Sequence, residues 1–150
     1  MSKIDLHIHS TASDGRLSPT EIVRQAVEKG LTVIAIADHD SVDGITPSLM
    51  AAEAFPSLKV IPCVEISTDV PNGEVHVLGY FIDYTNHEFQ ATLERLRHSR
   101  LQRSQGMIAK LNNLGIHKNQ KSFHCILLAL VYHRQFRKRV HFRYHYNQMQ

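Results

Sequence analysis

Two short runs of mostly apolar residues do most to restrict the fold that this chain can adopt. They span residues 31–37 and 58–66 and are rich in Ile, Val and other apolar residues. A strand that is buried on both faces reads as such a run, whereas a half-buried strand alternates between apolar and polar residues. Strands buried on both faces occur in parallel sheets covered by helices, so the two runs predict an α/β fold.

The segments around these runs carry the signals of helices. Ser18 and Glu21 form a capping box with proline at the first helical position, and Gly30 ends that predicted helix. A second helix is predicted over about residues 42–54. A long third helix is predicted over residues 87–114, with Asn86 as its cap and with Phe89, Leu93 and Leu96 among apolar residues at helical spacing. The alternation of strands and helices with short connections predicts a parallel sheet.

Two further strands are predicted at the start and in the middle of the chain. Residues 3–9 alternate strictly, with Ile4, Leu6 and Ile8 on one face and Asp5, His7 and His9 on the other. An Asn-Gly turn at residues 72–73 precedes the second of these strands, at residues 74–81. Since His76 lies near the start of that strand, we expect the strand to run antiparallel or to begin earlier.

Six residues with metal-binding side chains fall near the predicted ends of these strands or in the loop after the first strand. They are His7, His9, Asp14, His39, Glu65 and His76. Ligands of open α/β sheets bind beyond the carboxyl ends of the strands. Imidazole and carboxylate groups bind zinc, manganese and iron, and a bridging carboxylate suits a site with several ions. Several such ions close together would lower the pKa of bound water and also offset the charge of a phosphate.

Each of these residues also has a simpler interpretation. A single His-x-His on a strand is usually incidental, Glu65 alone could cap a helix, and His76 could be a satisfied core residue. Their shared position near strand ends favours the metal site. Asp5, Asp38 and Asp40 are either partners of imidazole N–H groups or solvated residues at strand ends.

The charge of the chain changes sign near residue 95. Residues 1–94 contain all fourteen Asp and Glu and five Lys and Arg, a net charge of −9. Residues 95–150 contain twelve Lys and Arg and no acid, a net charge of +12. Basic residues interleaved with aromatics also suit nucleic-acid binding. A nucleic-acid-binding protein that uses residues 95–150 is therefore one alternative to an enzyme, and an inactive remnant is another.

Composition excludes several other classes of protein. A chain of 150 residues suits one domain, and 43% hydrophobic with 21% charged residues excludes a disordered or collagen-like chain. No apolar run approaches the roughly 20 residues of a spanning helix, and the first residues lack the apolar stretch of a signal peptide. Cys63 and Cys125 cannot form a disulfide framework. We therefore expect a cytoplasmic protein with no membrane partner, and expect His87 and His98 on the surface of the long helix.

The motifs around the six candidate ligands resemble the amino-terminal half of a PHP domain, the polymerase and histidinol phosphatase superfamily of metal-dependent phosphoesterases. The stretches that carry the resemblance are residues 5–10, 13–15, Pro19 with Glu21, and residues 37–40, 64–67 and 76–80. Within the superfamily, the chain is most similar to stand-alone bacterial members that hydrolyse nucleotide phosphates or trim the 5′ ends of RNA.

The resemblance implies a fold, a site and a reaction. The fold is a distorted (β/α)7 barrel, and the site holds up to three metal ions, commonly manganese, zinc or iron. The implied ligands are His7, His9, Asp14, His39, Glu65 and His76. Among them, Asp14, His39 and Glu65 are the implied catalytic residues, with Glu65 bridging two ions. The implied reaction is attack of a metal-bound hydroxide on the phosphorus of a nucleotide or short RNA.

The sequence departs from the family pattern after about residue 116. The family supplies later ligands from an Arg-Pro-His-like motif and an Asp-x-His motif, but no aspartate follows Asp83. An eight-stranded α/β barrel needs about 250 residues. We therefore expect residues 1–116 to be the amino-terminal part of a PHP domain that lacks its carboxy-terminal strands. Residues 117–150 are expected to be a basic tail that is out of frame or disordered. We therefore also expect fewer bound ions than the family's three, weak activity, and self-association through an open sheet edge.

Overall fold

The structure is a computed structural model that describes residues 3–71 and 73–115. Its elements in chain order are β1 (Ile4–Ile8), α1 (Pro19–Glu28), β2 (Val33–Ile36), α2 (Ile45–Ala52), β3 (Lys59–Val70), β4 (Gly73–Tyr80) and α3 (His87–Asn113). The chain divides into two compact units, Met1–Ser99 and Arg100–Gln150, and the boundary falls within α3. The sheet and the candidate site belong to the first unit. The predicted tail at residues 117–150 lies outside the described residues.

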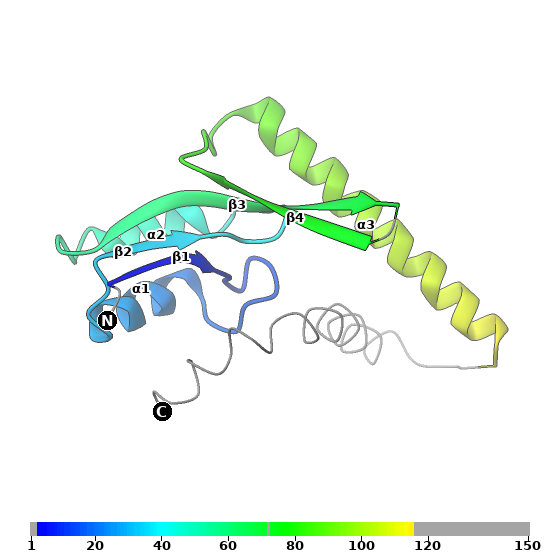
Figure 1. The fold of residues 1–150 in the computed structure, drawn as a ribbon, viewed down its shortest axis with the longest axis horizontal. Coiled ribbons are helices and arrows are strands. Elements are labelled where there is room, and N and C mark those ends of the chain that lie inside the picture. Colours follow the sequence, from blue (N-terminus) through cyan, green and yellow to red (C-terminus); the bar gives the residue numbers. More distant parts are fainter. Residues whose placement is uncertain (1–2, 72, 116–150) are drawn as a thin grey trace. The chain divides into compact units, whose positions relative to one another are not determined.

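The four strands form one sheet in the order β1-β2-β3-β4 (Figure 1). The pairs β1–β2 and β2–β3 are parallel, and β4 runs antiparallel to β3. Only residues 71 and 72 separate β3 from β4, and a connection this short can join only antiparallel strands. The α/β class and the antiparallel alternative for the strand with His76 are confirmed. The sheet is mixed rather than wholly parallel, and its identity as part of a distorted (β/α)7 barrel that lacks its carboxy-terminal strands stays a prediction.

Helix α1 forms as its capping box predicts. The Ser18 side chain accepts a hydrogen bond from the backbone N–H of Glu21, and the Glu21 carboxylate accepts one from the backbone N–H of Ser18 at 2.7 Å. The helix stops before Gly30, whose φ of 69° is a left-handed conformation that favours glycine. Residues of α1, β2, β3 and the position just before β3 share a buried core against which α2 also packs: Ile22, Val23, Ala26, Ile34, Ile36, Leu58 and Val60. Burial of this apolar surface is the main force that holds the two helices to the sheet.

Helix α3 begins after Asn86, whose side-chain oxygen accepts a hydrogen bond from the backbone N–H of Phe89 at 2.9 Å. Phe89, Leu93 and Leu96 pack in a cluster with Val64 of β3, as the helical spacing predicts. The helix ends before Gly115, and His87 and His98 are exposed on it as predicted. No helix in the described part of the chain has the length and apolar character needed to cross a membrane.

Three elements differ notably from the prediction in register, length or capping. The register of β1 against β2 shifts between Asp5 and Ile8, so the strict alternation of residues 3–9 is interrupted. Ile4 and Leu6 are 50% and 39% exposed because β1 is an edge strand of the described sheet. Strand β3 continues to Val70, past the predicted end at residue 66, because β4 pairs along its second half. Helix α2 is shorter than predicted and has no side-chain cap at its start.

Candidate metal centre

The six residues predicted from the sequence converge at one place in the structure. Their positions are His7 in β1, His9 just after it, Asp14 before α1, His39 after β2, Glu65 within β3 and His76 within β4. Every one of them belongs to a group of three potential metal ligands whose donor atoms lie within 4.8 Å of one another. The predicted proximity of these residues is therefore present in the structure.

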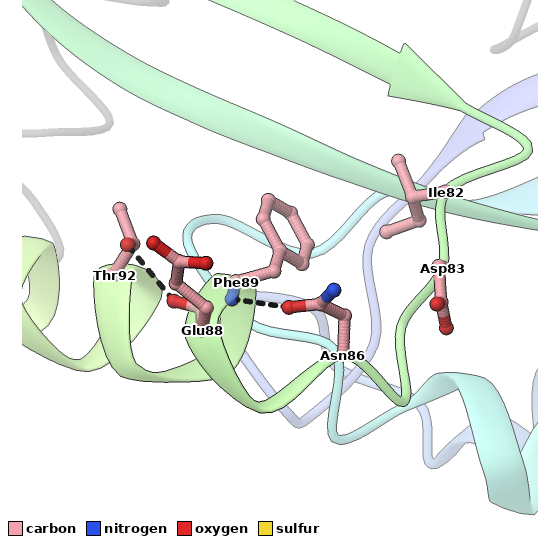
Figure 2. A pocket seen from close by; sticks show the side chains of 6 residues that line it. All are labelled: Ile82, Asp83, Asn86, Glu88, Phe89 and Thr92. Carbon is pink, nitrogen blue, oxygen red and sulfur yellow. Dashed lines mark hydrogen bonds between the residues drawn. The ribbon is translucent and has the colours of Figure 1, made fainter.

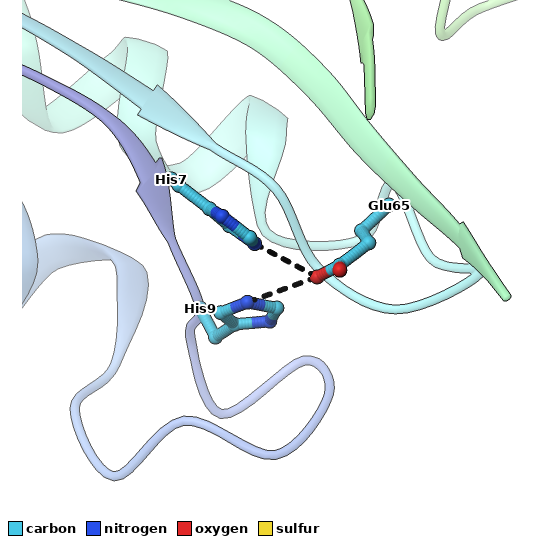
Figure 3. Close-up of side chains that lie close together, drawn as sticks. All are labelled: His7, His9 and Glu65. Atoms are coloured by element: carbon cyan, nitrogen blue, oxygen red, sulfur yellow. Dashed lines mark hydrogen bonds and ion pairs between the residues drawn. The ribbon is translucent and has the colours of Figure 1, made fainter. Parts of the chain in front are cut away.

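Glu65 lies at the centre of the cluster. Its Oε2 atom lies 2.9 Å from Nε2 of His7 and 3.1 Å from Nε2 of His9 (Figure 3). Its Oε1 atom lies 2.8 Å from Nδ1 of His76. The ring of His39 is slightly farther away, with Nδ1 at 3.6 Å from Oε2. One carboxylate thus lies within ion-pair distance of four imidazoles.

The backbone holds Glu65 firmly in this position. Its N–H donates to the carbonyl of Asp38 at 3.1 Å, and its carbonyl accepts from the N–H of Asp40 at 3.0 Å. Parallel pairing of β3 with β2 ends at Pro62, and an isolated bridge then links Glu65 to His39. Glu65 therefore lies inside β3, not at its end as predicted, yet beside the residues that leave the end of β2.

Asp14 lies on the other side of the cluster. Its Oδ1 is 3.2 Å from Nδ1 of His9, and its Oδ2 is 3.9 Å from Nε2 of His39. The loop that carries Asp14 turns back tightly on its own beginning. A Cβ atom at Gly15 would lie only 2.2 Å from the carbonyl oxygen of His9. Only glycine permits this approach, which explains the residue after Asp14.

Both carboxylates of the cluster are strongly acidic. Burial by itself would raise the pKa of Glu65, but the hydrogen bond with His7 and the adjacent ring of His9 outweigh burial and hold that pKa well below its usual range. Burial likewise opposes ionisation of Asp14, but the adjacent ring of His9 and the nearby charge of His39 lower its pKa to about 2. Both groups are therefore anionic oxygen donors at ordinary pH.

The two most buried histidines have pKa values shifted in opposite directions. Burial would lower the pKa of His9, but the adjacent carboxylates of Asp14 and Glu65 outweigh burial and raise it to about 9. Burial lowers the pKa of His39 to about 4, and the charges of Glu65 and Asp14 offset only part of this effect. His39 is thus neutral at ordinary pH, whereas His9 must lose a proton before it can bind a metal.

The donor set fits divalent metal ions. Within the described residues, three buried ring nitrogens have no hydrogen bond of acceptable geometry: Nδ1 and Nε2 of His9 and Nε2 of His39. Unsatisfied buried polar atoms are costly, and these three face carboxylate oxygens. The groups of three are His7, His9 and Glu65; His9, Asp14 and His39; and His39, Glu65 and His76. Imidazole nitrogen with carboxylate oxygen suits zinc, manganese or iron.

Sequence reasoning gave no role to Ser67, which lies beside the cluster. Its hydroxyl is 3.4 Å from Nδ1 of His39, and its N–H donates to Oδ1 of Asp40 at 3.0 Å. Ser67 therefore ties the segment after β2 to the second half of β3. Its one signal in the sequence is its place in the motif at residues 64–67.

The interpretation of two aspartates as partners of imidazole N–H groups is wrong. Asp5 accepts a hydrogen bond from the backbone N–H of His7 at 3.2 Å, not from a ring. The carboxylate of Asp38 accepts hydrogen bonds from Ser10 and Ser13. Both aspartates bind the chain near the candidate ligands, because short side chains at strand ends reach backbone and hydroxyl donors before they reach the rings.

A surface hollow of about 420 Å³ lies at the start of α3, apart from the six candidate ligands (Figure 2). Its lining residues are Ile82, Asp83, Asn86, Glu88, Phe89 and Thr92. The Asp83 carboxylate already accepts hydrogen bonds from the N–H and hydroxyl of Thr85. This hollow contains no imidazole, and the donor groups described above make the histidine cluster the better candidate site.

Comparison with known proteins agrees with this geometry. The sequence model that describes the PHP domain matches residues 5–149. The chain belongs to the PHP domain family. A 5′-3′ exoribonuclease from Haemophilus influenzae is 40% identical over 114 residues, which are 76% of this chain and 41% of the relative. A 3′,5′-nucleoside bisphosphate phosphatase from Chromobacterium violaceum is 36% identical over 77% of this chain and 40% of the relative. This PHP chain thus spans about two fifths of the length of these relatives.

Solved structures of similar proteins support the α/β fold. An amidohydrolase from Chromobacterium violaceum, solved with bound sulfate and no metal, superposes with a TM-score of 0.70 at 34% identity over 78% of this chain and 41% of that one. A protein described as a metal-dependent phosphoesterase from Bifidobacterium adolescentis gives a TM-score of 0.66 at 32% identity over 73% of this chain and 38% of that one. Together with the groups of His and carboxylate donors, these similarities support the use of a divalent metal by this PHP domain.

Proposed function

We propose that this PHP chain is a metal-dependent phosphoesterase that hydrolyses phosphomonoesters of nucleotides or trims the 5′ ends of RNA. The observation that carries the proposal is the Glu65 carboxylate, which lies 2.8–3.6 Å from four imidazoles. The names of the relatives, an exoribonuclease and a nucleoside bisphosphate phosphatase, both describe reactions at phosphate esters. They support nucleotides or RNA as the substrate class.

The proposed ligands are the six clustered residues, and the proposed metals are manganese, zinc or iron. A divalent ion, when bound, lowers the pKa of coordinated water and offsets the charge of a phosphate. Glu65 is suited to bridge two ions because it belongs to two of the three donor groups. Asp14 contributes an ionised carboxylate, and His39 contributes a neutral ring at ordinary pH. We assign the catalytic roles to Asp14, His39 and Glu65.

We also propose that turnover by these 150 residues is slow. The later Arg-Pro-His-like and Asp-x-His motifs of the family do not occur after Asp83 in the sequence, and loss of supporting groups typically costs a metal site about 10–100-fold in affinity or activity. The exposed apolar residues of edge strand β1 favour self-association.

The boundary near residue 116 stays a prediction, although the family match continues to residue 149. We also propose that the protein is located in the cytoplasm.

Nucleic-acid binding by residues 95–150 remains the alternative function. Most of the basic residues in that segment lie outside the described residues. Arg97, which is described, already pairs with Asp43 at 3.3 Å and with Glu94. This cation is therefore largely compensated by acids of the chain itself, which weakens the alternative at that position.

The proposal can be tested on the complete 150-residue chain. The protein is stripped with a chelator, reloaded with manganese or zinc, and assayed on a nucleoside 3′,5′-bisphosphate and on a 5′-phosphorylated RNA. We expect phosphate or nucleotide release that disappears in Glu65→Gln and persists in Glu53→Gln, an identical change at an exposed position. Turnover of a peptide or lipid ester, with none on any nucleotide, would contradict the proposal.

A further inference from the structure

We propose that Asp38 is a positioning residue that fixes the loop of residues 10–15 and thereby places Asp14 against His9 and His39. The inference rests on the proposed metal site, because it assigns Asp38 a role toward one of the proposed ligands. Asp38 directly precedes His39 and is 1% exposed. A buried carboxylate needs hydrogen-bond donors, and the identity of those donors shows what the carboxylate holds in place.

All three donors to Asp38 come from the loop of residues 10–15. Its Oδ1 accepts from the backbone N–H of Ser10 at 2.7 Å and from the hydroxyl of Ser13 at 2.5 Å. Its Oδ2 accepts from the hydroxyl of Ser10 at 2.7 Å. Hydrogen bonds to an ionised carboxylate are roughly twice as strong as neutral ones, so this contact anchors the loop to the end of β2.

Hydrogen bonds within the loop connect this contact to Asp14. The carbonyl of Ser10 accepts hydrogen bonds from the N–H of Ser13 at 3.1 Å and from the N–H of Gly15 at 2.8 Å. Ser13 and Gly15 are the two neighbours of Asp14 in the chain, so the backbone on both sides of Asp14 is tied to Ser10. Asp38 holds Ser10, and it therefore acts on Asp14 through the loop.

A second observation supports this arrangement from the opposite side. A Cβ atom at Gly44 would lie 2.5 Å from Oδ2 of Asp38 and 2.8 Å from the hydroxyl of Ser10. The space beside the Asp38–Ser10 contact is thus only large enough for glycine. Gly44 directly precedes α2 and has an ordinary helical φ of −77°, so the close approach of Asp38 and Ser10, and not the backbone conformation, favours glycine there.

The first test measures the loop without metal. In the complete chain, Asp38→Asn keeps the shape of the side chain but replaces one acceptor oxygen with a donor group. We expect hydrogen exchange at the amides of Ser10 and Gly15 to accelerate on the order of tenfold or more, the value of one charge-assisted hydrogen bond. Amides of core strand β2 should be unchanged. Asp43→Asn, an identical change at an exposed position of the following loop, should leave exchange in the loop of residues 10–15 unaltered.

The second test asks whether Asp38 acts through Asp14. Asp38→Asn should weaken Mn²⁺ binding about 10–100-fold, as expected for a supporting group. In an Asp14→Asn background, the same change should cost little further affinity, because the positioned ligand is already lost. An equal additional loss in both backgrounds would show a general structural effect and overturn the inference.

The outcomes separate this inference from the proposed function. If the native chain binds no Mn²⁺, the proposed metal site fails, but the exchange measurement still decides whether Asp38 holds the loop. Unchanged exchange in Asp38→Asn overturns the inference whatever the metal result. If Asp38→Asn does not fold, Ser13→Ala removes one of the three hydrogen bonds and should give a smaller acceleration of the same amides. An unchanged loop in Ser13→Ala would then overturn the inference.

Discussion

Glu65 and His76 meet diagonally across the β3–β4 pair, with Oε1 of the carboxylate 2.8 Å from Nδ1 of the ring. The residue directly opposite Glu65 is Leu78, and the residue directly opposite His76 is Ser67. Diagonal neighbours on one face of an antiparallel pair are within reach of long side chains. The contact therefore requires both the antiparallel direction of β4 and its observed register.

Replacement of both strand histidines should remove metal from the chain. In His7→Ala/His9→Ala, two of the three donor groups lose ligands, so stoichiometric metal in elemental analysis should fall to background. The matched control is His87→Ala/His98→Ala, because both of these histidines are exposed on α3. Unchanged metal content in the first double variant would refute the proposed ligands.

Metal binding near pH 7 should release protons. The pKa of His9 is raised to about 9, so the ring is protonated in the metal-free chain and must give up about one proton to become a ligand. Calorimetric titration in buffers of different ionisation enthalpy measures this release. Repeating the titration above the pKa of His9 is the control, since the contribution of this ring should vanish there. Equal release on both sides of that pKa would contradict the assignment.

The stability of the metal-free chain should fall on both sides of about pH 6.5. The raised pKa of His9 gives stability that is complete below 6.5 and is lost as pH rises through about 9. The pKa of His39 is lowered to about 4, so stability is lost as pH falls from 6.5 through that value. Urea unfolding in the presence of a chelator measures both limbs. A His9→Ala variant that keeps the full alkaline limb would show that another group causes it.

Ser18→Ala should destabilise the fold by about 1 kcal/mol, the usual value of an N-cap residue. The change removes the acceptor for the backbone N–H of Glu21 while leaving the buried face of α1 intact. The midpoint of urea unfolding should therefore fall without a change in slope. Gln25→Ala, at an exposed position of the same helix, should stay within about 0.5 kcal/mol of the native chain. An equal loss in both variants would argue against the cap.

Local signals in the sequence predict much of this fold. The capping box at Ser18 and the cap at Asn86 depend only on neighbouring residues, and both occur in the structure. The six candidate ligands were predicted to gather because parallel strands end at one edge of a sheet. The position of Glu65 inside β3 was missed, because the length of that strand depends on its partner β4.

The contacts of Asp38 could not be read from the sequence for a different reason. Its partners Ser10 and Ser13 lie more than twenty residues away in the chain, and no periodicity links a strand-end aspartate to hydroxyl residues in another loop. The alternation of apolar and polar residues also could not predict the register shift in β1, because that prediction assumes regular strand pairing.

The diagonal contact between β3 and β4 has a consequence for how the protein matures. A slip of β4 by one residue would turn His76 to the opposite face of the hairpin, because successive side chains alternate. The donor group of His39, Glu65 and His76 exists only when the hairpin pairs in its native register. A metal ion present during refolding would thus act as a template that selects one pairing among competing ones. The coordination group would then form in the same step as the native register of the hairpin.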